Sequence, residues 1–453
     1  MADSWGGVEV IKALFTFDNG LTYEIDSAYK SDESSGIQQC ALNENEAITS
    51  GNPIGIMSSN TLSLEVFDKN NYLSPLNDRS PYYGFMRSGV RIDLSVSYDG
   101  GDSWGNFGVF YTNSWRTPYI DGYNGLSVIT ACDRLQYLGN SLIPKLPIYA
   151  GVEIKDLIKN VFLALGLTED EFAIDSSLNL NLLFGVTPGA KVRDFLNTVC
   201  QALIARVIID RDGVIRIIPA DKSYGNYYIA REDVIIDASA YYNTNNIYNK
   251  VKIIYDKIGS TSVETITTMR GVTLKPGLNK LQNIRFSKKV LAITGIHIEA
   301  MSEKLEQGDF VSMNIDSWTS YQSGIDLNVN NWLSEDIPTE SITIEGVVIN
   351  SIEATVEVPI EEADTKIGNT LEIRNEFIQD EESATRIAKQ AADFLYRSSY
   401  MLELNTLLDA SVMVGDTVEV IATALHMHEV FKVVNCVTSF GYNYTKKLTL
   451  MKE

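Results

Sequence analysis

The feature that most constrains the fold is a period-two pattern of apolar residues in the first 140 positions. Four segments alternate apolar with polar residues or are rich in aromatic and β-branched side chains, namely 11–17, 61–67, 90–97 and 108–115. Clusters of Gly, Asn, Asp and Pro separate these segments. The pattern is typical of short strands that bury one face and are joined by turns. The sequence therefore predicts a β domain over residues 1–145.

The period changes to that of a helix after residue 150. Apolar residues of segment 154–165 follow the i, i+3, i+4, i+7 spacing of an amphipathic helix, and Gly166 follows as a C-terminal cap. A second helix is predicted over 192–204. Asp212-Gly213 then separates two apolar runs, which is a strong signal for a β-hairpin. Residues 146–235 are therefore predicted to form a small α/β domain.

β patterning returns from residue 247 and continues to 359. It includes a segment rich in Asn, Ser and Trp, 317–341, which we expect to be a long loop. An acidic stretch from Glu353 to Glu382 follows, and we interpret it as a solvated edge or linker. We assign residues 236–380 to a second β domain.

The last part of the chain combines one helix with strands. Apolar residues between Ala384 and Leu395 lie on one helical face, and the acids and serine of 380–383 provide a cap. Three strands are predicted near the C-terminus, over 417–421, 430–437 and 447–450. Residues 381–453 are therefore expected to complete the second β domain. The predicted fold class is mainly β, of the α+β type.

Short stretches of the sequence are similar to one another. Gly308-Asp309-Phe310-Val311 and Gly415-Asp416-Thr417-Val418 each open an alternating strand, and related strands follow at 348–352 and 433–437. A weaker similarity begins at Ser88-Gly89-Val90 and continues at 111–115. Gly-Asp turns are common in β proteins and could explain this match. The alternative is a repeated barrel module, which would suit a ring whose copies occupy similar positions.

Composition and charge exclude several classes of function. The 453 residues suffice for about three domains. A hydrophobic content of 45% and a charged content of 21% are those of a folded chain. The net charge of −22 argues against tight, sequence-independent binding of nucleic acid, which depends on basic residues that neutralise phosphates. The acidic start and the absence of long apolar runs predict neither signal peptide nor membrane span, so synthesis in the cytosol is expected.

The residues that could carry chemistry are few. The four cysteines share no CxxC-type spacing, which favours buried free thiols. The glycine-rich, zinc-protease and serine-hydrolase motifs are missing. Acid pairs such as Glu361-Glu362 and Glu381-Glu382 could in principle serve a glycosidase, but sequence does not give their separation. We therefore assign no catalytic or cofactor-binding residue.

One pair of histidines has a spacing compatible with a metal site. His426 and His428 would face the same side of a strand and could share an ion, with Glu429 as the nearest further ligand. The alternative is that both histidines lie in an exposed loop. No metal ligand is assigned on this basis.

Residues 97–104 resemble the Asp-box of sialidases. Ser97, Asp99, Gly101, Ser103 and Trp104 fit the Ser-x-Asp-x-Gly-x-Ser-Trp pattern. Sialidases carry several such boxes, and this sequence has one. We interpret the box as a device that stabilises a hairpin, in which short polar side chains bind turn amides while the Trp packs on the sheet.

Several segments, in order along most of the chain, resemble phage baseplate hub proteins. They comprise 64–68, Leu73-Ser74-Pro75, the strand 108–111, Thr130 to Leu138, the helix 192–206 with its hairpin 207–218, the helix 384–397, and the strand that begins at Gly415-Asp416. The segment 317–341 has no counterpart in this resemblance.

The resemblance implies a fold and a function. Such hubs contain two tail-tube-like β-barrels, here expected in 1–145 and 236–380, with the small α/β domain inserted between them. Three copies would form a homotrimeric ring in the virion, at the end of the tail. The ring would adapt the sixfold tail tube to the threefold central spike, with the tape-measure protein and baseplate wedge or distal tail proteins as further partners. No catalytic residue and no cofactor is implied.

In this setting the acidic charge gains a physical role. A channel through which DNA passes without being bound should present neutral or acidic groups, because basic ones would retain phosphates. Two other classes remain open. The chain could be a tail-associated enzyme that degrades the cell wall, or a receptor- or carbohydrate-binding protein in which Trp318, Tyr321 and Trp332 stack on sugars.

Overall fold

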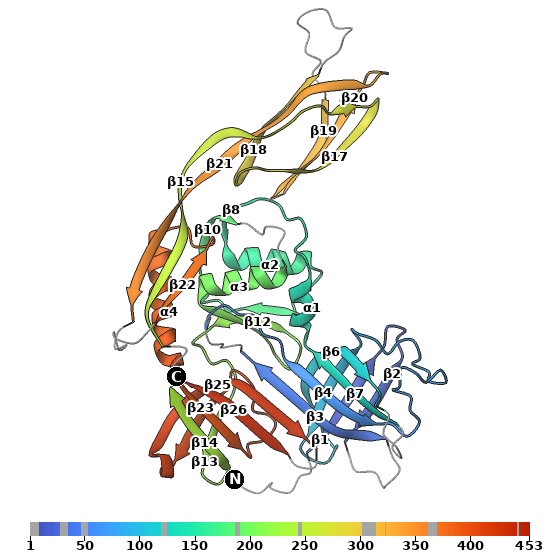
Figure 1. Cartoon of the computed structure of the whole chain (residues 1–453), viewed down its shortest axis with the longest axis vertical. Helices are drawn as coiled ribbons and strands as arrows, with labels where there is room; N and C mark the ends of the chain where they lie inside the picture. Colours follow the sequence, from blue (N-terminus) through green and yellow to red (C-terminus); the bar gives the residue numbers. More distant parts are fainter. Residues whose placement is uncertain are drawn as a thin grey trace, which may run out of the picture.

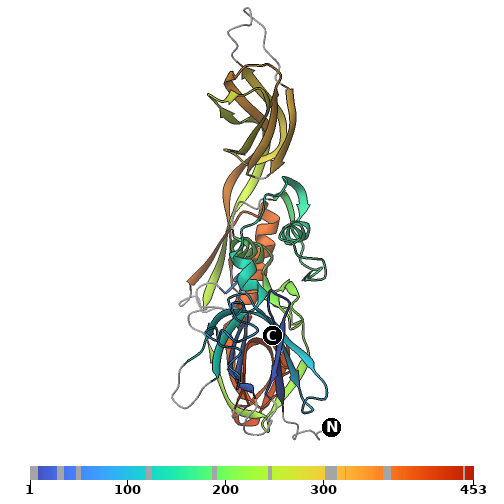
Figure 2. The same cartoon turned by 90° about the vertical axis from the view of Figure 1, so that its right-hand side faces the viewer.

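The computed structural model describes residues 9–27, 35–46, 53–118, 125–185, 191–242, 247–300, 314–321, 323–360, 369–441 and 444–453. The molecule is elongated, with two half-barrels side by side at one end (Figures 1 and 2). A small α/β domain lies above them, and a long ribbon of paired strands leads to a β module at the far end. The expected mainly β fold is confirmed.

One sheet of thirteen strands forms both half-barrels. Its order is β14 (Ile235–Tyr242), β23 (Tyr400–Thr406), β26 (Thr445–Lys452), β25 (Met427–Phe440), β3 (Gly36–Asn45), β4 (Thr61–Phe67), β7 (Leu126–Cys132), β6 (Gly105–Arg116), β5 (Arg91–Ser97), β1 (Val10–Thr16) and β2 (Thr22–Asp26). β24 (Thr417–Ala422) pairs with β25, and β13 (Tyr227–Arg231) pairs with β24. Strands from both ends of the chain therefore share one hydrogen-bonded ladder.

Each half-barrel curls around its own hydrophobic core. The N-terminal half-barrel, β1 to β7, buries residues such as Phe15, Leu64 and Phe107. The C-terminal half-barrel, β13, β14 and β23 to β26, buries another set that includes Leu402 and Phe431. The alternation predicted from the sequence is visible in β4 and β24, where every second residue is buried.

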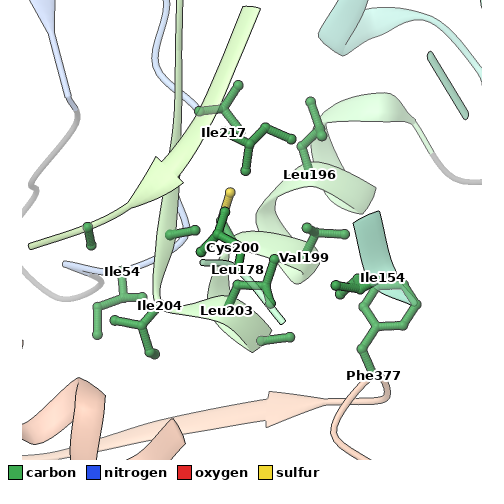
Figure 3. Close-up of a cluster of buried hydrophobic side chains, with 14 of the residues drawn as sticks. Ile54, Ile154, Leu178, Leu196, Val199, Cys200, Leu203, Ile204, Ile217 and Phe377 are labelled. Atoms are coloured by element: carbon green, nitrogen blue, oxygen red, sulfur yellow. The ribbon is translucent and has the colours of Figure 1, made fainter. Parts of the chain in front are cut away.

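The α/β domain contains the helices and hairpin expected from the sequence. It comprises α1 (Arg134–Asn140), β8 (Tyr149–Glu153), α2 (Ile154–Ala164), β9 (Phe172–Ile174), β10 (Asn181–Gly185), α3 (Val192–Leu203), β11 (Ala205–Ile209) and β12 (Ile215–Pro219). Figure 3 shows its core, in which Leu196 and Cys200 of α3 cluster with Ile217 of β12. Ile54 and Phe377, which are distant in sequence, join the same core and tie the domain to the remaining chain.

The remaining strands form an arm. β15 (Tyr248–Met269) and β21 (Ile337–Pro359) are paired over most of their length, with β22 (Asn369–Asn375) beside β15 near the base. α4 (Glu381–Ser398) packs on β15 and β21. The tip module consists of the outer parts of this ribbon with β16 (Thr273–Leu274), β17 (Gly277–Arg285), β18 (Val290–Ala300), β19 (Asn314–Tyr321) and β20 (Gly324–Asn331).

The arm differs from the expected second barrel over 236–380. Apart from β14, the described strands in that range form the ribbon and the tip module, whereas the C-terminal half-barrel is built from strands within 227–242 and 400–452. The segment 317–341 contains most of β19 and β20 and is not a long loop. Period-two alternation identifies a strand but not its distant partner, and the sequence pattern is the same in a ribbon and in a barrel.

The two half-barrels have the same topology. The path β3-β4-β7-β6-β5 corresponds to β14-β23-β26-β25-β24, in the same chain order and with every neighbour antiparallel. β-Bulges recur at equivalent places. One follows Ile37 in β3 and Ile235 in β14, and another follows Thr112 in β6 and Val433 in β25. Register irregularities at matching positions indicate one duplicated module.

The weak sequence similarity at Gly89 belongs to this duplication. Gly89 and Gly415 have φ angles of 93° and 92°. Gly89 N donates to Thr112 O over 2.8 Å, and Gly415 N donates to Val433 O over 2.9 Å, so each glycine starts the strand that follows it in the same way. The stronger sequence match at 308–311 lies outside the described residues. Its companion strand, 348–352, lies in β21 of the arm.

The two glycines give a matched test of this geometry. Positive φ at a residue with a side chain costs about 1–2 kcal/mol, and a Cβ on Gly89 would meet no atom within 4 Å. A Cβ on Gly415 would overlap the Tyr224 ring. We expect Gly89→Ala to lower the free energy of unfolding by about 1–2 kcal/mol, and Gly415→Ala by about 3–5 kcal/mol. Urea unfolding followed by tryptophan fluorescence measures both, and equal losses would contradict the assigned contact.

Candidate functional site: a polar face across both half-barrels

The shared sheet has a continuous face directed away from the two hydrophobic cores. Cross-strand partners lie on the same face, so the pairing register defines its rows. One row contains Ser239, Glu403, Thr449, Asn435 and Asn45. The next contains Asp237, Asn405, Lys447, Val437, Asn43 and Thr61. A third contains Thr445, Ser439, Ala41, Ser63, Thr130 and Ser114. We call these three rows the polar face.

The polar face is lined mainly by uncharged hydrogen-bonding side chains. None of its members is buried. Asn435 Nδ2 donates to Asn43 Oδ1 over 3.0 Å, which links the two half-barrels across the β3–β25 joint. Ser114 and Thr130 hydroxyls are 2.7 Å apart. Such pairs leave few groups that would bind a passing ligand strongly.

The charged members of the polar face are Asp237, Glu403 and Lys447. The Lys447 Nζ lies 2.9 Å from Glu403 Oε2, and this hydrogen bond raises the pKa of the lysine. Asp237 accepts a hydrogen bond of 2.7 Å from the Asn405 amide. The one lysine is therefore paired with an acid, and the face offers no basic cluster that would hold phosphates.

A buried ion network fixes the joint behind the polar face. The Arg211 guanidinium lies 3.0–3.1 Å from both carboxylate oxygens of Glu44 on β3. It also donates to the carbonyls of Ala410 and Val412 and lies 4.3 Å over the Phe107 ring. Burial lowers the pKa of Arg211, but the charge and hydrogen bonds of Glu44 outweigh this and raise it. The arginine thus joins the α/β domain to both half-barrels.

A second part of this junction network lies next to the first. Glu46 is 2% exposed at its side chain and pairs with both Arg206 and Lys432, the latter with Nζ at 3.0 Å. Lys432 Nζ also donates to Ala220 O over 2.7 Å. Burial lowers the pKa of Lys432, and the nearby Arg206 charge adds to this. A buried cation of this kind is tolerated only with an anion and carbonyls around it.

The histidines are not brought together with a set of metal ligands. His428 Nε2 lies 2.6 Å from Glu419 Oε1, while His426 has a φ of 51° in the turn before β25. Glu429 is 2.8 Å from Lys452 Nζ. Within the ranges that the structure describes, no group of three or more His, Cys, Asp or Glu side chains could hold a metal ion.

The acid pair that the structure describes does not form part of a site. Glu381 and Glu382 lie in the first turn of α4, where acids favour the helix dipole, and Glu381 Oε2 is 3.5 Å from Lys257 Nζ. The pair Glu361-Glu362 lies outside the described residues. All four cysteines are buried and free. In the part of the chain that is described, no helix is long and apolar enough to cross a membrane.

The Asp-box residues form a tight hairpin turn between β5 and β6. Ser97 Oγ accepts from Gly101 N over 2.8 Å, and Asp99 Oδ1 accepts from Ser103 N over 2.9 Å. Hydrogen bonds from Ser103 and Ser97 lower the pKa of the Asp99 carboxyl. The Trp104 ring lies 4.4 Å from Lys12 Nζ. These contacts are internal to the half-barrel and support the structural interpretation of the box.

The aromatic residues of the tip module have different environments. Trp332 is 73% exposed and Trp318 46% exposed, whereas Tyr321 is only 6% exposed. Tyr321 is unsuited to stacking on a sugar because its hydroxyl donates to Asp326 and Lys145 lies 4.3 Å over its ring. A groove of about 430 Å³ lies between β18 and β19, and Trp318 lines it with Ile296 and Ile315.

Comparisons with known proteins place the fold. No protein-family description matches the sequence, and no curated protein matches it. Among the solved structures that match are two tail proteins that cover almost the whole chain. A tail protein from Neisseria meningitidis MC58 has a TM-score of 0.54 at 10% identity, covering 98% of this chain and 97% of its own. The 43 kDa tail protein of prophage MuSo2 from Shewanella oneidensis has a TM-score of 0.53 at 12% identity, covering 98% of each chain.

The chain has the fold of a phage tail protein. The resemblance found in the sequence is thus confirmed at the level of the fold. The sequence alone did not reveal the polar face. Asn, Ser and Thr alternate with buried residues in any strand that has one solvated side, and only the register shows that these positions are continuous across two half-barrels.

Removal of one ion pair tests the junction network. Arg211→Ala leaves Glu44 buried without its partner, so we expect the free energy of unfolding to fall by about 3–5 kcal/mol. Lys447→Ala breaks the solvated pair with Glu403 in the same sheet and should cost less than about 1 kcal/mol. Chemical denaturation of both variants makes the comparison. A loss below about 1 kcal/mol for Arg211→Ala would show that the buried pair does not hold the joint.

Proposed function

We propose that this protein is a structural hub of a phage tail baseplate. In this proposal three copies form a ring, and six half-barrels continue the sixfold tail tube while the trimer as a whole matches a threefold central spike. The observation that carries it is the duplication, because two modules with the same topology and the same bulges are joined in one ladder. A chain that presents two similar modules can occupy two adjacent positions of a sixfold ring.

The polar face supports a role as a channel wall. A face of Asn, Ser and Thr with its one lysine paired to an acid would contact DNA without retaining it. The net charge of −22 supports the same view, because the soluble chains would repel polyanions before and after assembly. The proposal requires no catalytic residue or cofactor.

The proposed partners follow from this position. The tail tube protein and the tape-measure protein would contact one side of the ring, and the central spike the other. Baseplate wedge or distal tail proteins would contact its outside. The protein would be synthesised in the cytoplasm of the host bacterium and reside in the tail of the virion.

The solution mass tests the ring. The 50.3 kDa chain should form a particle of roughly 151 kDa, which is three times that mass. Light scattering coupled to size-exclusion chromatography measures it, and negative-stain images should show an annulus with three lobes. A 50.3 kDa species that persists at high protein concentration would contradict the proposal. Clearing of purified cell wall in a zymogram would instead favour the enzyme alternative.

A second function is favoured by the exposed tryptophans of the tip module. Trp332 and Trp318 of the tip module present apolar rings to solvent, where a receptor or glycan could reach them. If the tip binds a glycan, Trp332→Ala should reduce its signal on a glycan array at least tenfold. Tyr83→Ala, which removes an aromatic side chain of 51% exposure from the N-terminal half-barrel, is the matched control. Equal signals from both variants would remove this second function.

A further inference from the structure

The joint between the two half-barrels provides a template for contacts between chains. β25 and β3 pair antiparallel over Asn435–Phe440 and Cys40–Asn45. In this register Val437 lies opposite Asn43, and Thr438 lies opposite Leu42. The joint thus extends the ladder of one module by the first strand of the other.

The duplication assigns an equivalent to each residue of this joint. The bulges after Thr112 and Val433 align β6 with β25. Arg116 and Val437 each lie four residues beyond these positions and are therefore counterparts. Thr117 is then the counterpart of Thr438. On the other strand, the bulges after Ile37 and Ile235 align β3 with β14. Tyr241 is then the counterpart of Asn43, and Ala240 the counterpart of Leu42.

The equivalent edges are unpaired within the chain. Among the described residues, β14 pairs with β23 alone, and the end of β6 from Ser114 to Arg116 pairs with β7 alone. In β25 the corresponding edge is covered by β3. The exposure pattern agrees, because Leu42 of β3 is 1% exposed whereas Ala240 of β14 is exposed and Tyr241 is 37% exposed.

We propose that β14 of one copy pairs antiparallel with the end of β6 in the next copy, with Arg116 opposite Tyr241 and Thr117 opposite Ala240. This inference rests on the proposed ring and specifies how its copies join. The contact is heterologous, since two different edges meet, and repeated head-to-tail pairing closes into a ring when the rotation per copy allows it. Both edges would otherwise remain templates for uncontrolled strand addition.

The pairing register identifies two residues that a disulfide should join between neighbouring copies. Residues directly opposite on antiparallel strands have Cα atoms about 4.5–5.5 Å apart, within the roughly 4.4–6.8 Å that a disulfide spans. Arg116 and Tyr241 belong to strands seven places apart, or about 34 Å along the curved sheet at ~4.8 Å per strand, and a disulfide within one chain would run as a monomer on the gel. The four native cysteines are buried and do not compete.

The test is oxidation of the Arg116→Cys/Tyr241→Cys double variant of the full chain with diamide. We expect a covalent trimer on a non-reducing gel, lost on reduction. The matched control is Arg116→Cys/Asp237→Cys, in which the second cysteine lies on the same face of β14 but four residues, or about 13 Å, out of register. The control should remain monomeric on the gel.

The outcomes separate this inference from the proposed function. A particle of three chains in solution, together with no cross-link or equal cross-linking of both variants, would overturn the register and leave the ring intact. A monomer in solution with no cross-link would overturn both. A covalent ladder longer than three chains, seen only for the Arg116→Cys/Tyr241→Cys variant, would support the pairing and contradict closure at three.

Discussion

The buried junction network is the constraint on which the rest of the architecture depends. Two half-barrels and an α/β domain meet where Glu44 and Glu46, at the end of β3, face Arg211, Arg206 and Lys432. Charges removed from water are costly unless opposite charges lie beside them, so these ion pairs form only when all three parts are docked together. The same strand, β3, then carries the ladder into β25 and holds the polar face continuous. The relative placement of the modules therefore follows from a few buried ion pairs as well as from apolar packing.

Much of the local structure could be predicted from the sequence, and most of the long-range pairing could not. Helical periodicity located α2 and α3, and Asp212-Gly213 located the hairpin between β11 and β12. These signals are local, because the residues that decide them are a few positions apart. The arm was missed because β15 and β21 pair across a large sequence separation, and alternation is the same whichever strand is the partner. The polar face was missed for a related reason, because only the register between strands decides which residues lie side by side on it.

The duplication shows which parts of a module must be kept and which can change. The bulges after Thr112 and Val433 and the positive-φ glycines at 89 and 415 recur, although the side chains around them differ. Backbone irregularities of this kind set the curvature of the sheet, and they can be kept with many different side chains. The roles that we propose rest instead on the polar face, which spans both modules, and on the strand edges, of which β3 and β25 are paired with each other.

The arm has a consequence for symmetry. In the chain order of the duplicated module, the arm and α4 lie between β14 and β23, where the other module has only the short connection from β3 to β4. In the proposed ring, half-barrels of the same topology would therefore alternate between one that carries the arm and one that does not. In a closed ring the wall would repeat with every module, whereas the outline would repeat with every second one. One insertion, present in only one of the two duplicated modules, would therefore give the outside of the ring half the rotational symmetry of its inner wall.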